Sequence, residues 1–154
     1  GANLGANIRA LKSVTDAELH AVEPNGKARD IMVSDDVLPA ARVVDATASN
    51  LPFSDGQIDL VFTAGVLIHI PHDSIEAAYR EMHRVAGRFL LSIEYFSPAP
   101  VEVPYRGEMD LLFKRDFGGL WLDLFDDLEH VANGFFWKRT TGLDDVTWWL
   151  FRKK

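Results

Sequence analysis

The sequence predicts one α/β domain over residues 1–154, built around a mainly parallel sheet. Three observations lead to this fold class. The length of 154 residues suits a single hydrophobic core. Apolar runs of strand length alternate with stretches of helical periodicity, as is typical of βαβ units. No internal repeat and no linker rich in Gly, Ser or Pro divides the chain.

The first part of the chain alternates short strands with helices. Apolar residues at helical spacing predict a helix directly after the first glycines, with Leu4, Ile8, Leu11 and Val14 on one face. Asn25 is expected to cap a second helix whose buried face carries Ala28, Ile31 and Met32. The expected strands are residues 19–23, 42–45 and 58–63, with a turn at Asp55–Gly56 before the last. The run 58–63 is almost continuously apolar, which predicts a buried central strand.

The second part continues the alternation and then changes character. Asp73 and Ser74 open a helix with one apolar stripe, formed by Ile75, Ala78, Tyr79, Met82 and Val85. A strand at 89–95 is followed by a passage in which Pro98, Pro100 and Pro104 argue against regular structure. A short helix near 120–128 precedes two strands, 131–138 and 146–152, which the turn at Thr141–Gly142 predicts to be antiparallel.

The composition excludes several classes of function. The net charge of −7 argues against a general nucleic-acid binder, and no apolar run is long enough for a membrane helix. The chain contains no cysteine and opens with no secretory signal, which favours a cytoplasmic protein. His69 and His72 have no third ligand at a suggestive spacing, so no metal site is expected.

The opening turn and a later acidic residue indicate a cofactor that contains ribose. Gly1, Asn3 and Gly5 lead straight into the first helix, and glycine allows a backbone turn to lie against a ligand. Glu23 ends the next strand about twenty residues on, a spacing at which a carboxylate binds ribose hydroxyls. Each feature alone also fits a plain helix start or a solvated acid. Together they leave a nicotinamide dinucleotide and S-adenosylmethionine open as cofactors.

Three later segments resemble the middle motifs of class I S-adenosylmethionine-dependent methyltransferases. They are Asp45-Ala46, the run Leu-Pro-Phe-Ser-Asp-Gly at 51–56, and the strand at 58–62. The resemblance implies a Rossmann-like methyltransferase fold and S-adenosylmethionine as cofactor. It assigns the methionine part to Gly1, Asn3 and Gly5, the ribose to Glu23, and the adenine to Asp45 and Ala46. It also places Thr63, Ala64 and Gly65 at the methyl-donor end.

The chain departs from that family's pattern at its beginning. Asn3 stands where the family's turn has its middle glycine. The family's first strand, which lies at the centre of its sheet, would come before Gly1 and is absent from this sequence. An N-terminally truncated domain is therefore expected, with two strand edges left without that partner.

The later segments narrow the resemblance to one subgroup of these enzymes. Residues 94–107, 112–117 and 145–153 resemble methyltransferases associated with the biosynthesis of pseudaminic acid, a bacterial nonulosonic acid. The subgroup implies a small anionic sugar or nucleotide-sugar as the methyl acceptor.

Several polar and aromatic residues are candidates for the acceptor side. His69 follows a predicted strand and is the first candidate base, its alternative being a packing residue that bonds the loop, and Glu94 is the second candidate. Three cations suit an anionic group, namely Arg106, Lys114 and Arg115. Tyr95 and Tyr105 could cover a sugar ring, whereas Trp148 and Trp149 are expected to pack on the two faces of an internal strand.

The sequence thus predicts an enzyme that moves a methyl group from S-adenosylmethionine to a small acceptor. Two alternatives stay open at this point. One is a methyltransferase-like module that binds without catalysing, and the other is a nicotinamide-dependent oxidoreductase, which the Asn3 turn fits poorly. A homodimer is a further expectation, because a second chain can pair with an open strand edge.

Overall fold

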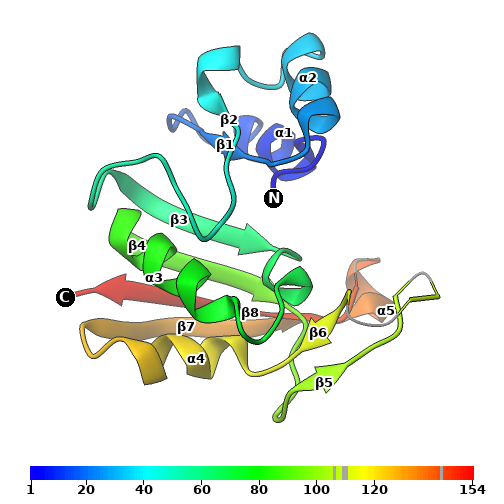
Figure 1. Ribbon diagram of the computed structural model, residues 1–154, viewed down its shortest axis with the longest axis vertical. Coiled ribbons are helices and arrows are strands. Elements are labelled where there is room, and N and C mark those ends of the chain that lie inside the picture. Colours follow the sequence, from blue (N-terminus) through cyan, green and yellow to red (C-terminus); the bar gives the residue numbers. More distant parts are fainter. Residues whose placement is uncertain (106, 109–110, 143) are drawn as a thin grey trace. The chain divides into compact units, whose positions relative to one another are not determined.

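The computed structural model describes the chain except for four residues. The described ranges are 1–105, 107–108, 111–142 and 144–154. The chain folds into two compact units, Gly1–Pro52 and Phe53–Lys154, which are described separately (Figure 1). No helix among the described residues has the length and apolar character needed to cross a membrane.

The first unit is a small α/β layer with two parallel strands. Its elements are α1 (Ala6–Lys12), β1 (Ala21–Val22), α2 (Gly26–Ser34), the 3₁₀ turn η1 (Ala40–Arg42) and β2 (Val43–Val44). Ala21 pairs with Val43 and Val22 with Val44. The opening segment joins this layer, because the Ala2 amide donates to the Val22 carbonyl at 2.9 Å.

Both helices predicted for the first unit are present, but α1 is shorter than its apolar pattern predicts. Leu4 and Val14 lie outside the helix and are exposed, to 47% and 77%, so only Ile8 of the predicted face is buried. Ile8 of α1 packs in a core with Met32 and Val37. The Asn25 side chain caps α2 by accepting a hydrogen bond from the Ala28 amide at 3.3 Å. The expected burial of Ile31 is wrong: its side chain is 40% exposed, because only the residues four apart on α2, Ala28 and Met32, face the core.

The second unit contains a four-stranded mixed sheet in the order β3-β4-β8-β7. Its strands are β3 (Ile58–Ala64), β4 (Ala86–Glu94), β7 (Leu128–Phe136) and β8 (Val146–Lys153). β3 and β4 are parallel, whereas β8 runs antiparallel to both β4 and β7. The predicted C-terminal antiparallel pair is therefore confirmed. β8 is one of the two internal strands of this sheet, the other being β4, and on β8 Trp149 is buried and Trp148 half-buried.

β3 is not the buried central strand that its apolar run predicts. Asp59 and Leu60 are exposed, Leu60 to 43%. Among the described residues β3 has only β4 as a hydrogen-bonded neighbour, so it forms one edge of this sheet. A continuous apolar run indicates that burial of the strand is favourable, but it does not determine how many strands pair with it.

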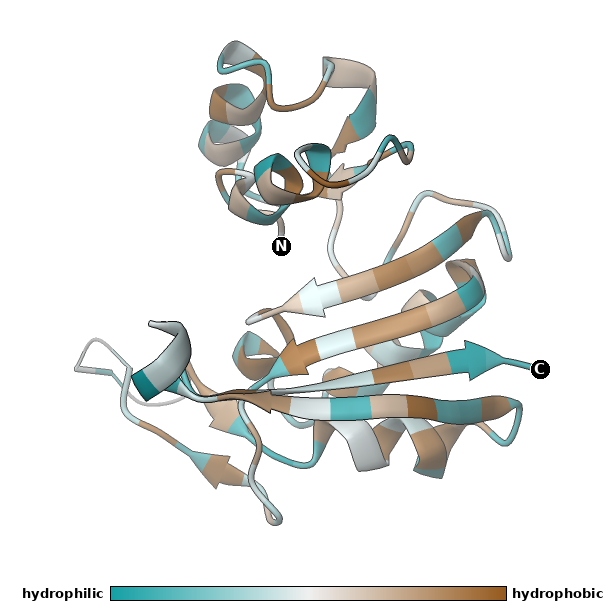
Figure 2. Cartoon of the chain, turned by 180° about the vertical axis from the view of Figure 1, so that it is seen from behind, coloured by the Kyte–Doolittle hydropathy of each residue, from teal (hydrophilic) through white to brown (hydrophobic). Residues whose placement is uncertain are grey.

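Helices α3 (Ile75–Val85) and α4 (Phe117–Leu124) cover one face of this sheet (Figure 1). All five residues of the predicted α3 stripe are buried. The rings of Tyr79 and Trp121 pack against each other in this layer, with centroids 4.2 Å apart and planes tilted by 44°. The Tyr79 hydroxyl donates to the Phe117 carbonyl, and the Trp121 indole N–H donates to the Ser92 hydroxyl. α4 begins three residues earlier than expected because the Asp116 side chain caps it. Most residues of β3 and β4 are hydrophobic (Figure 2).

The proline-rich passage is more regular than its prolines predict. β5 (Val101–Glu102) lies between them and pairs antiparallel with β6 (Phe113–Lys114). Two strand residues fit between Pro100 and Pro104 because neither proline has to donate to that short ladder. Two further short elements, η2 (Leu67–His69) and α5 (Lys138–Thr141), complete the described chain.

Candidate functional site

The opening turn lies directly against the acid that ends β1. Asn3 and Gly5 both adopt left-handed backbone conformations, with φ of 49° and 79°, and α1 begins immediately afterwards. The Asn3 amide donates to Glu23 Oε2 at 2.7 Å. The left-handed pair thus turns a backbone amide toward the carboxylate, and the turn and the acid form one site within the first unit.

The Glu23 carboxylate is buried and partly satisfied by the backbone. Its Oε1 atom accepts a second hydrogen bond, from the Asn25 amide at 2.9 Å. A carboxylate has about four lone-pair positions, so these two amides leave acceptor capacity on both oxygens. Fixed in this way, Glu23 can accept hydrogen bonds from two neighbouring hydroxyl groups, as a ribose diol presents them.

Arg29, which the sequence pattern does not single out, connects Asp45 to the end of β1. Arg29 of α2 donates from Nη2 to Asp45 Oδ2 at 2.7 Å. Its Nη1 atom donates to the carbonyls of Glu23 and Pro24, both at 2.8 Å. The side chains of helical residues lean toward the N-terminus, so a long side chain in the early part of α2 was the available signal. Ala46 follows, half-buried.

The other predicted cofactor residues belong to the second unit. Thr63 and Ala64 end β3, Thr63 being buried. Gly65 then turns the chain with φ of 62°, and its amide donates to the Ile93 carbonyl at 2.9 Å. The assignment of these three residues to the methyl-donor end stays a prediction.

Glu94 lies at the end of β4, completely buried beneath the turn that follows β3. Its Oε1 atom accepts hydrogen bonds from the amides of Val66 and Leu67, both at 3.2 Å. Burial raises the pKa of Glu94 to about 7, although the Thr63 hydroxyl and the amides of the turn oppose the shift. A carboxyl held in this way supports the turn that carries His69, and it is closed off from a dissolved acceptor.

His69 ends η2 and is exposed, with a defined tautomer. Its Nδ1 atom lies 2.7 Å from the Leu111 carbonyl, which can only accept a hydrogen bond. The ring therefore carries its proton on Nδ1, and in the neutral form Nε2 is the basic atom. The Tyr105 ring lies beside it with centroids 5.4 Å apart. This arrangement suits a general base, because the bond on one nitrogen orients the other.

Two of the candidate acceptor residues are occupied by neighbours in the structure. The Tyr95 hydroxyl donates to Asp144 Oδ2 at 2.6 Å, and burial together with this bond raises the pKa of Tyr95 to about 12. The Lys114 ammonium lies 5.1 Å from the centre of the Tyr95 ring, a cation–π geometry. Lys114 is half-buried and remains able to meet an anion.

Arg115, predicted from the sequence to meet an anionic group of the acceptor, is buried. Only 4% of the residue is exposed, and the central carbon of its guanidinium lies 5.4 Å from the centre of the Phe113 ring and 5.6 Å from that of Phe117. One nitrogen, Nη2, donates to the Ile70 carbonyl at 3.2 Å, while Nε and Nη1 have no partner among the described residues. The two flanking aromatic residues explain the burial. Arg106, the third cation, lies outside the described residues.

The comparison with known proteins identifies the family. The family model described as "Methyltransferase domain" matches residues 1–88, more than half of the chain. The chain belongs to the methyltransferase domain family. It is an S-adenosylmethionine-dependent methyltransferase, and the match runs through both units. No curated protein matches the chain in sequence.

Solved structures show the same fold in other methyltransferases. A methyltransferase from Methanosarcina mazei has 12% identity and a TM-score of 0.76, over 99% of this chain and 89% of the other. The 1,6-didemethyltoxoflavin-N1-methyltransferase of Burkholderia thailandensis, with bound S-adenosylhomocysteine, has 17% identity and a TM-score of 0.73. The match covers 100% of this chain and 68% of the other. Magnesium protoporphyrin IX methyltransferase of Synechocystis PCC 6803, with bound S-adenosylmethionine, has 12% identity and a TM-score of 0.72. The match covers 100% of this chain and 67% of the other. At these identities the likeness establishes the Rossmann-like methyltransferase fold alone.

The described part of the methyltransferase contains no group of three or more His, Asp or Glu side chains that could hold a metal ion. The polar groups of the candidate site are the carboxylates of Glu23 and Asp45, at the ends of β1 and β2, and the imidazole of His69. They suit binding of a cofactor sugar and base, and removal of a proton from an acceptor.

Proposed function

We propose that the first unit of this methyltransferase holds the adenosine part of S-adenosylmethionine at the carboxyl ends of β1 and β2. The observation that carries the proposal is the contact of the opening turn with Glu23, at 2.7 Å from the Asn3 amide. Glu23 accepts from the ribose hydroxyls, Asp45 and the Ala46 backbone meet the adenine, and the turn at Gly1, Asn3 and Gly5 takes the methionine part. Parallel strands of open α/β sheets carry their ligands at this end.

The cofactor assignment predicts the effect of removing either carboxylate. Glu23→Ala and Asp45→Ala should each weaken the binding of S-adenosylhomocysteine about tenfold to a hundredfold, because each removes a charged hydrogen-bond acceptor. Titration calorimetry measures the affinities. Asp35→Ala is the matched control, since Asp35 is an acid of the same unit that pairs with Arg9 at the end of α2. Unchanged affinity in the Glu23 variant would contradict the assignment.

We further propose that the methyl acceptor is a small anionic sugar of nonulosonic acid metabolism. The similarity of residues 94–107, 112–117 and 145–153 to the pseudaminic acid subgroup supports this choice. The half-buried Lys114 next to the Tyr95 ring suits an anion beside a sugar face. Arg106 remains a candidate for the same anion, and Tyr105 for the sugar, whereas the burial of Arg115 favours a structural role. A homodimer also stays a proposal.

His69 is the base in this proposal. S-adenosylmethionine supplies a methyl group on a positively charged sulfur and leaves as S-adenosylhomocysteine. The acceptor hydroxyl loses its proton to His69 Nε2 as its oxygen forms the new bond to the methyl carbon, and the bond from that carbon to sulfur breaks. In the neutral ring, the hydrogen bond of Nδ1 to the Leu111 carbonyl fixes the tautomer in which Nε2 carries the lone pair that accepts the proton.

Transfer of a labelled methyl group tests this role. With a nonulosonic acid and its nucleotide-linked form as acceptors, His69→Gln should lower kcat about a hundredfold or more, while KM changes little, because general-base catalysis contributes in that range. His72→Gln is the control, because His72 is an exposed imidazole three residues away. Equal activity of the His69 variant and the wild type would exclude this base. Binding of S-adenosylhomocysteine without transfer to any acceptor would favour the non-catalytic alternative.

A further inference from the structure

We propose that Arg29 is a positioning residue for the adenosine part of the cofactor, because it ties together the strand ends that carry Glu23 and Asp45. The inference rests on the proposed function, in which those two acids meet the ribose and the adenine. It assigns to Arg29 a role that neither the family match nor the sequence pattern indicates.

One guanidinium makes all of the connections. Nη1 donates to the carbonyls of Glu23 and Pro24, where the chain leaves β1, and Nη2 donates to Asp45 Oδ2, where it leaves β2. The three distances are between 2.7 and 2.8 Å. A planar guanidinium presents its N–H groups in a fixed fork. The two strand ends are therefore held at one separation and in one orientation.

The ion pair also determines which oxygen of Asp45 faces a ligand. The Asp45 side chain is 68% exposed, so without a partner it would sample several rotamers. Arg29 occupies Oδ2, and Oδ1 has no partner among the described residues. Oδ1 is then the atom that accepts from the exocyclic amine of adenine, which is a donor. The positive charge of Arg29 also offsets the repulsion between two acids at neighbouring strand ends.

The partners of Arg29 are such that its removal should leave the unit folded. Pro24 and Asp45 are exposed, so water can replace the guanidinium at the Pro24 carbonyl and at the carboxylate. The core of the unit, formed around Ile8, Met32 and Val37, does not include Arg29. Removal of the Arg29 side chain should therefore change the positions of the groups that face the ligand and leave the core of the unit intact.

The test compares two ligands that differ at one atom of the base. S-adenosylhomocysteine carries the amine, and S-inosylhomocysteine carries a carbonyl oxygen in its place. The wild-type chain should prefer the first, because Asp45 Oδ1 attracts a donor and repels an acceptor. Arg29→Met keeps the length of the side chain and removes the fork. It should weaken S-adenosylhomocysteine about tenfold to a hundredfold and the inosyl compound much less, so that the preference shrinks.

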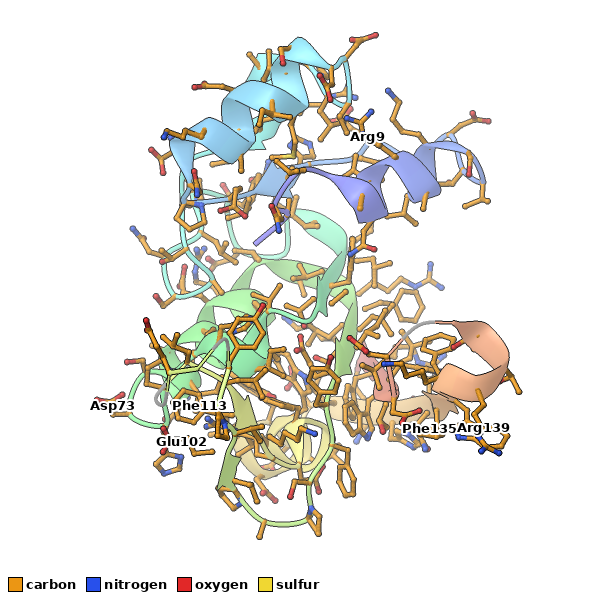
Figure 3. The ribbon with its side chains drawn as sticks, turned by 90° about the vertical axis from the view of Figure 1, so that its right-hand side faces the viewer. Arg9, Asp73, Glu102, Phe113, Phe135 and Arg139 are labelled. Carbon is orange, nitrogen blue, oxygen red and sulfur yellow. The ribbon has the colours of Figure 1, made fainter. Side chains whose placement is uncertain are left out.

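Arg29→Lys and Arg9→Met complete the experiment. A single ammonium cannot span the three acceptors of the fork, so the lysine variant should lose most of the preference as well, which keeps the test valid if the methionine variant is poorly folded. Arg9, labelled on α1 in Figure 3, also pairs with an acid of the same unit, with Nη2 2.8 Å from Asp35 Oδ2. Arg9→Met should keep the wild-type affinity for both ligands.

Three outcomes would overturn the inference. Wild-type affinity and preference in both Arg29 variants would do so, as would an equal loss for the two ligands, which a general loosening of the unit produces. In either case, a weakened Glu23→Ala variant would leave the proposed function standing. A wild-type chain that binds neither ligand would overturn the proposed function and, with it, the role of Arg29.

Discussion

A Glu94→Gln variant will be more stable than the wild-type chain at about pH 8, by up to about 3 kcal/mol, and the difference will vanish toward about pH 4. The carboxyl has a pKa of about 7 in the folded chain, against 4.5 for an unperturbed glutamate. Between these values the folded chain holds a proton that the unfolded chain has lost. The wild-type free energy of unfolding therefore falls as the pH rises through this window and becomes level above it.

Glutamine removes this penalty because it has the same shape and no charge. Its carbonyl oxygen can accept from the Val66 and Leu67 amides as Oε1 does, and its amide group takes the place of Oε2, which has no hydrogen-bond partner among the described residues. Urea unfolding, followed through the fluorescence of the four tryptophans, all of which belong to the same unit, measures the difference at each pH. The change should be largest above about pH 7.

Glu129→Gln is the control for this experiment. Glu129 is exposed, and its hydrogen bond to Arg152 lowers its pKa, so its removal should change stability little and in the opposite direction. A Glu94→Gln variant that is no more stable than the wild type at high pH would show that the carboxyl is ionised without cost where it lies.

Replacing Gly5 with alanine should destabilise the first unit by about 3 kcal/mol and abolish the binding of S-adenosylhomocysteine. Two costs add at this position. Gly5 has φ of 79°, which an alanine adopts at a cost of about 1–2 kcal/mol. An added Cβ would lie 2.9 Å from Val37 Cγ1 and 3.1 Å from Met32 Cγ, inside the core of the unit. Moving those side chains costs about 1–3 kcal/mol more.

Amide hydrogen exchange over residues 1–52 measures the loss, since about 3 kcal/mol raises exchange through unfolding more than a hundredfold. Gly142→Ala separates the two costs, because Gly142 has φ of 71° and no atom within 4 Å of an added Cβ. The control should lose only the backbone part, in the second unit. If Gly5→Ala loses no more than Gly142→Ala, the Val37 contact carries no cost and the packing argument fails.

The elements that depend on local pattern were predictable from the sequence. The α3 stripe from Ile75 to Val85 is one example, because helical spacing fixes which residues share a face. The capping of α2 by Asn25 is another, since a cap and its amide partner lie three residues apart. The C-terminal antiparallel pair followed from alternation and a turn in the same way.

Features that depend on distant neighbours were not predictable. The apolar run of β3 does not reveal that β3 ends the sheet, and nothing in the proline passage indicates the pairing of Val101 with Lys114. The site shows the same limit. The spacing of the opening turn and Glu23 in the sequence predicts that they belong to one site. The ion pair of Arg29 with Asp45 joins residues 16 positions apart, and no sequence motif indicates it. The burial of Arg115 does not follow from its charge, whereas Phe113 and Phe117, two residues away on either side in the sequence, favour it.

The division at Pro52 has a consequence for how this enzyme can be observed. Residues 1–52 contain no Phe, Tyr or Trp, so the whole near-ultraviolet signal of the protein arises from residues 53–154. The part proposed to hold the adenosine is optically silent. Any change of intrinsic fluorescence on adding S-adenosylhomocysteine would therefore come from the second unit, and would show whether that unit responds to the ligand.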